Sequence, residues 1–96
     1  MAPFQTSQGA ISEEMVTKVG TAAGRVARIQ QEYAVQAKAE TATDAREALA
    51  SQAREAAERA IDEQGISVQD YNTVLGAAET DQDLEQRLLD VAREVL

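Results

Sequence analysis

Apolar residues that recur at helical spacing over residues 12–40 constrain the fold more than any other feature of the sequence. They follow one another at intervals of four and three, which is the period of one face of an α-helix. These residues are Met15, Val19, Ala22, Val26, Ile29, Tyr33 and Ala37. Further apolar residues widen the face to nearly half of the helix circumference, so we expect this helix to contact two neighbouring helices.

Local signals mark where this first helix begins and ends. Ser12 can cap its N-terminus, and Ile11 and Val16 occupy the positions of a hydrophobic staple across that cap. Residues 40–44 contain two β-branched residues, and Asp44 with Glu47 has the spacing of a capping box. We therefore predict a break at 40–44, although one continuous helix is the alternative because no glycine or proline enforces the break.

Three more helices are indicated downstream. An alanine-rich segment at 44–64 has high helix propensity and ends at Gly65, which can adopt a left-handed conformation. Ser67 and Asp81 are the predicted N-caps of a third and a fourth helix. Their apolar stripes are Val68, Tyr71, Val74, Leu75 and Ala78, and then Leu84, Leu88, Val91 and Val95.

These elements predict an all-α fold of about four helices. We expect two long helices in an antiparallel hairpin, with a short C-terminal pair packed at one end. We predict a single helical domain over residues 12–96 and a disordered tail over residues 1–11, which contain the only proline.

The composition limits both the core and the chemistry. Aromatic residues are only 3% of the chain and alanine supplies much of its apolar content, so we expect a thin core that a partner could complete. Cysteine and histidine are absent, which removes thiol nucleophiles, the commonest general base and the commonest metal ligand. The net charge of -8 argues against nucleic acid as a partner. We predict no cofactor, no metal and no transmembrane segment.

The segment GISVQDYN at residues 65–72, followed by DQDL at 81–84 and Arg87-Leu88, is distinctive. It resembles the closing motif of a bacterial family called domain of unknown function 4168. The motif usually has proline where this chain has Gln82, a position where proline is merely favourable for a helix. The resemblance implies a periplasmic or secreted protein whose signal peptide is not in this sequence, with a cytoplasmic location as the alternative. It implies no activity.

Two pairs of residues within the predicted helices are candidates for recognition. Tyr71 and Asn72 could present a phenol and an amide together, but Tyr71 lies on an apolar stripe and we favour a place for it in the core. Gly20 and Gly24 each cost a helix about 1 kcal/mol relative to alanine. We expect another helix to approach closely there, either from this chain or from a second copy.

Acidic residues at 81, 83 and 85 alternate like the start of a calcium loop. An EF-hand also needs glycine at its sixth position and glutamate at its twelfth, where this chain has Gln86 and Ala92. Helix capping explains Asp81 and Asp83 without an ion.

The sequence thus favours a non-catalytic interaction or structural module of the cell envelope, whose partner is a second copy or another envelope protein. The alternative is a helical domain that binds a small apolar ligand or a lipid in an alanine-lined gap between helices. An enzyme that uses Tyr71 with carboxylates is disfavoured, and we predict no catalytic residue. The candidate interaction or motif residues are Gly20, Gly24, Gly65, Ser67, Tyr71, Asn72, Asp81, Leu84 and Arg87.

Overall fold

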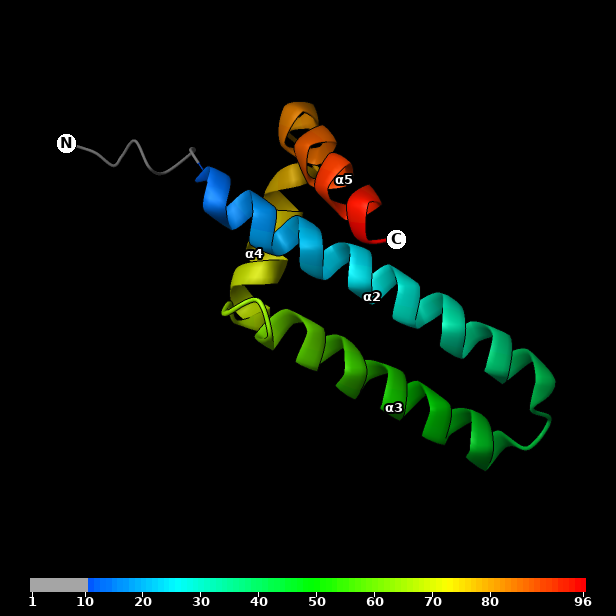
Figure 1. Cartoon of the computed structure of the whole chain (residues 1–96). Coiled ribbons are helices and arrows are strands. Elements are labelled where there is room, and N and C mark those ends of the chain that lie inside the picture. The colour runs from blue at the N-terminus through cyan, green and yellow to red at the C-terminus, as the bar shows by residue number, and fades with distance from the viewer. Residues whose placement is uncertain (1–10) are drawn as a thin grey trace.

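A computed structural model describes residues 11–96 of the chain, and within them it contains four helices and no strand (Figure 1). The helices are α2 (Glu13–Ala39), α3 (Thr43–Asp62), α4 (Val68–Ala78) and α5 (Gln82–Val95). The predicted all-α class is therefore confirmed. The predicted tail at 1–11 lies outside the described residues except for Ile11, which is half-buried and packs against the core.

The two long helices α2 and α3 form an antiparallel hairpin, and α4 and α5 pack at one end of it (Figure 1). Helix α5 lies beside the first half of α2 and runs in the same direction as α2. The second half of α2 has only α3 beside it. The molecule is consequently elongated, with extents of 56 × 23 × 21 Å.

Three helices begin at the caps that the sequence predicts. The side chains of Ser12, Ser67 and Asp81 each accept a hydrogen bond from the backbone N–H three residues further on, at 3.1, 2.9 and 3.1 Å. Each bond satisfies one of the donors that the first turn of a helix leaves without a partner. These caps fix the start of α2, α4 and α5.

The break between the long helices is confirmed, but its predicted cap is wrong. Helix α3 begins at Thr43, and its N-cap is Ala42, whose backbone is extended and whose side chain makes no capping bond. Asp44 instead lies in the first turn of α3, where a negative charge interacts favourably with the helix dipole. An acid near a helix start serves either role, so the capping-box spacing did not distinguish them.

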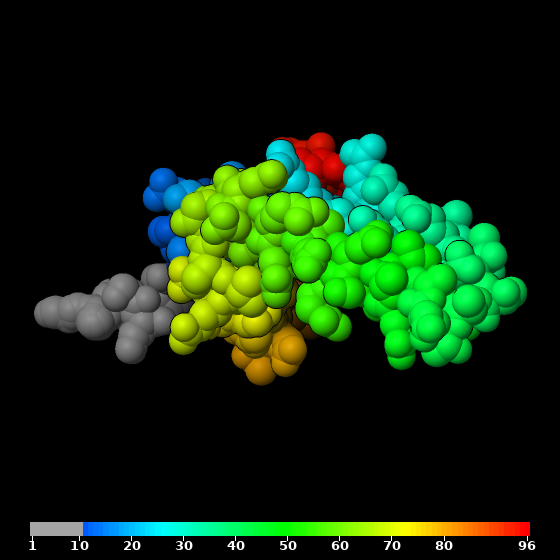
Figure 2. Space-filling model, turned by 90° about the horizontal axis from the view of Figure 1, so that it is seen from below, coloured from blue at the N-terminus to red at the C-terminus, as the bar shows by residue number. Residues whose placement is uncertain are grey.

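The core occupies only the end of the molecule where all four helices meet. Its buried members are Val16, Val19, Ala22, Ile61, Ile66, Tyr71, Val74, Leu84 and Leu88. From residue 25 to residue 59 no side chain is buried. We call residues 30–57, the outer part of the α2–α3 hairpin, the hairpin arm. Figure 2 shows it extending away from the packed end.

Candidate functional site

Gly20 and Gly24 form the surface on which α5 crosses α2. A Cβ atom added at Gly20 would lie 2.7 Å from Cβ of Val91, and one added at Gly24 would lie 2.6 Å from the carbonyl oxygen of Ala92. Both distances are shorter than real Cβ contacts, so only glycine permits this approach. The helix that packs on these glycines is α5 of the same chain.

The turn between α3 and α4 depends on Gly65 and the two residues after it. Gly65 has a φ of 76°, a left-handed conformation that side-chain-bearing residues adopt at a cost. Ile66 then turns into the core and is buried, and Ser67 caps α4. These residues of the distinctive motif therefore set the direction in which α4 leaves the hairpin.

Tyr71 and Asn72 do not form one surface patch. The Tyr71 side chain belongs to the core and is 8% exposed, whereas Asn72 lies exposed on α4. Burial raises the pKa of the Tyr71 phenol above its ordinary value, because desolvation disfavours the charged phenolate. This environment suits a packing role better than recognition or acid–base chemistry.

The raised pKa of Tyr71 predicts a loss of stability at alkaline pH. Below about pH 10 both folded and unfolded states keep the phenol neutral. Above it the unfolded state releases the proton first, so the free energy of unfolding falls as pH rises through the pKa of the folded state. We expect urea titrations between pH 8 and 11 to show this fall. Tyr71→Phe should be less sensitive to pH, and equal sensitivity in both proteins would contradict the prediction.

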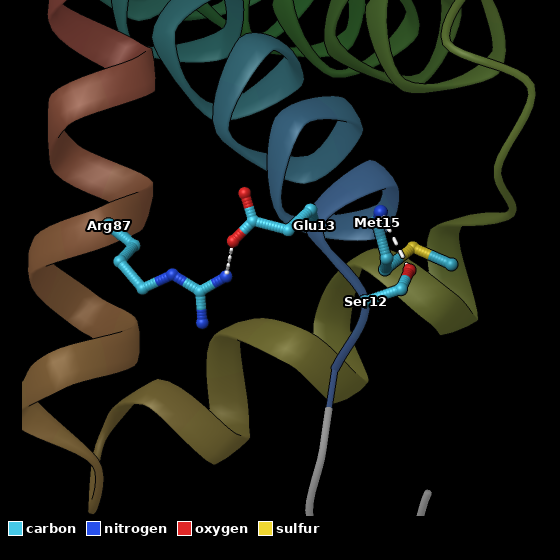
Figure 3. A network of polar contacts seen from close by, with 4 residues as sticks. All are labelled: Ser12, Glu13, Met15 and Arg87. Carbon is cyan, nitrogen blue, oxygen red and sulfur yellow. Dashed lines mark hydrogen bonds and ion pairs between the residues drawn. The ribbon is translucent and has the colours of Figure 1, made fainter.

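Leu84 and Arg87 attach α5 to the start of α2. Leu84 is buried in the core, next to the cap formed by Asp81. The Arg87 guanidinium forms an ion pair with the Glu13 carboxylate in the first turn of α2, close to the Ser12 cap (Figure 3). Apart from Asn72, every candidate motif residue thus has a structural role in a turn, a cap, the core or a helix crossing.

A second feature is an apolar hollow between α2, α4 and α5. An alanine-lined gap between helices was expected from the sequence, but the residues that line it were not. Its volume is about 210 Å³. It is lined by Ala23, Leu75, Ala78, Glu79, Glu85, Leu88, Leu89 and Ala92. Leu89 is 44% exposed at its edge. The sequence feature that could have indicated the hollow is the pair of adjacent leucines Leu88 and Leu89. Only Leu88 belongs to the apolar stripe of α5, so Leu89 is an apolar residue outside it.

A larger and more polar groove of about 500 Å³ lies between α2 and α3, near the end of α5. Arg25 of α2 forms an ion pair with Glu63 across it at 3.2 Å, and Arg28 pairs with Glu32 along α2 at 3.8 Å. The groove is also lined by Arg59. Because Arg25 and Arg28 are paired with glutamates, the groove presents less free positive charge than three arginines would.

Within residues 11–96, no three His, Cys, Asp or Glu side chains are grouped so that they could hold a metal ion. Across this described part of the chain, no helix combines the length and the hydropathy needed to cross a bilayer.

Comparison with known proteins gives one match. The sequence model of a family described as "Domain of unknown function (DUF4168)" matches residues 5–88. This range contains α2, α3 and α4 and extends to Leu88 of α5, so it includes Gly20, Gly24 and the turn at Gly65, but not Val91 and Ala92 of α5, which pack against the two glycines. No curated protein and no solved structure matches the chain.

Proposed function

The chain belongs to the DUF4168 family, and from that premise we propose that it is a non-catalytic helical interaction module of the bacterial cell envelope. Its partner is a second copy of the chain or another envelope protein. The motif residues other than Asn72 support this proposal because they build the fold.

The observation that carries the proposal is the incomplete cover of the hairpin arm. The apolar face of α2 is wide enough for two neighbours, and near Gly20 and Gly24 it has both α3 and α5. Beyond the end of α5 only α3 remains, and Val35 is 70% exposed. Val35 lies three helical turns beyond Gly24 on the same side of α2. A helix from another molecule would cover this side where α5 no longer does.

A change at Val35 tests this proposal. We expect sedimentation velocity over a hundredfold range of concentration to show association of the unmodified protein. Val35→Asp should weaken it by about tenfold or more, because a charge would then be buried in the contact. Val68→Asp is the matched control, since Val68 is also an exposed valine but lies on α4.

Association with a different envelope protein requires a second measurement. A photo-reactive residue at position 35 should then give a cross-linked product of defined mass in cells that make the protein, and one at position 68 should not. A strictly monomeric protein that also gives no cross-link at position 35 would overturn the proposal.

A second candidate function, the binding of a small apolar ligand, would use the apolar hollow. Its volume of about 210 Å³ is below the roughly 300–1,000 Å³ of typical ligand pockets, so it fits a side chain better than a lipid. Native mass spectrometry of the purified protein distinguishes the two functions, because a retained lipid would favour ligand binding.

A further inference from the structure

We propose that the apolar hollow between α2, α4 and α5 is a docking site for a basic amphipathic segment of a partner protein, which inserts an apolar side chain next to two acidic residues. This inference rests on the proposed function, to which it adds a second surface and the chemistry of the partner that would bind there.

The hollow forms because small residues line it together with larger ones. Ala23, Ala78 and Ala92 leave space where three helices meet, and leucines line the rest of the apolar surface. Leu89 keeps 44% of its surface exposed, so it would lose further contact with water when an apolar group enters. Burial of apolar area in this way contributes roughly 25 cal/mol per Å².

The charges at the hollow favour a positively charged partner segment. Glu79 and Glu85 line it, and no lysine or arginine does so. Within residues 11–96 neither carboxylate forms an ion pair. A segment that carries lysine or arginine close to its apolar residue would complement both acids.

The position of Glu79 at the end of α4 also favours a positively charged partner. Glu79 is the C-cap of α4, and the last turn of α4 contains no basic residue. A negative charge at the C-terminal end of a helix is unfavourable because the helix dipole is negative there. A cation from the partner would offset both the carboxylate and the dipole.

A second copy of this chain is a poor occupant of the hollow. A symmetric contact centred on the hollow would bring Glu79 and Glu85 of one copy close to the same residues of the other. Like charges in contact oppose association. The residues that line the hollow do not overlap with those of the hairpin arm, so the two are separate surfaces.

The test uses a fluorescent synthetic peptide of 14 residues, with leucine at helical spacing and lysine elsewhere. We expect fluorescence anisotropy to show binding that Glu79→Gln/Glu85→Gln weakens by about tenfold. The double variant Glu47→Gln/Glu94→Gln removes the same charge from exposed positions outside the hollow, and should weaken binding less than about twofold.

Apolar insertion is tested by a second pair of variants. Leu89→Ser should weaken binding of the peptide by about tenfold, and Val68→Ser should leave it unchanged. In ¹⁵N NMR spectra, the largest shifts on adding peptide should fall on residues that line the hollow. Equal weakening by both pairs of acidic variants would show general attraction to an acidic chain and overturn the inference.

A peptide in which glutamine replaces lysine completes the design. If it binds as tightly as the lysine peptide, the acidic rim has no role and the inference is wrong. If the lysine peptide fails to bind while the contact at Val35 is observed, only this inference fails. If no contact at Val35 is detected either, the proposed function fails with it.

Discussion

Replacing both Gly20 and Gly24 by alanine is expected to lower the free energy of unfolding by about 2 kcal/mol. Each added methyl group would overlap α5, and overpacking of this kind costs about 1–3 kcal/mol per site. Alanine recovers about 1 kcal/mol per site through its higher helix propensity. Urea denaturation followed by circular dichroism measures the net effect.

Gly76→Ala is the control for this prediction. Gly76 also lies within a helix, but a Cβ atom added there would meet nothing within 4 Å. This variant should therefore gain up to about 1 kcal/mol of stability from helix propensity alone. If the Gly20/Gly24 double variant is stabilised to a similar extent, α5 does not cross α2 at these glycines.

The glycine pair also shows how far the sequence could predict the fold. Helix starts at Ser12, Ser67 and Asp81 were predictable because a cap is a contact between residues three apart. The close approach at Gly20 and Gly24 was predictable as well, since glycine in a helix is costly without a reason. Whether the approaching helix came from this chain was not predictable, because that depends on contacts between distant segments.

The candidate site was harder to predict for the same physical reason. The motif residues from Gly65 to Arg87 were recognisable, but a residue type does not reveal whether it caps, packs or binds. The hollow forms only because Ala23 of α2 meets residues of α4 and α5. Spacing along one helix carries no information about such a meeting.

The confinement of the core to one end leads to the second large prediction, which concerns Leu88. Leu88 is 5% exposed and belongs to the buried cluster. Leu88→Ala should lower the free energy of unfolding by about 3 kcal/mol, within the usual range of about 2–5 kcal/mol for a buried leucine. The total free energy of unfolding of a chain of this length is about 5–14 kcal/mol. The adjacent Leu89→Ala should cost less than about 1 kcal/mol, since Leu89 is already partly exposed.

Amide hydrogen exchange can show where this stability resides. Between residues 25 and 59 no side chain is buried, so amides in the hairpin arm should exchange through local opening. Their rates should be unchanged by Leu88→Ala. Amides around Val19 and Leu84 should exchange only through global unfolding. In Leu88→Ala the free energy of their opening should therefore fall by the full loss of stability, about 3 kcal/mol. A uniform loss of protection along α2 would show instead that the arm and the packed end unfold as one cooperative unit.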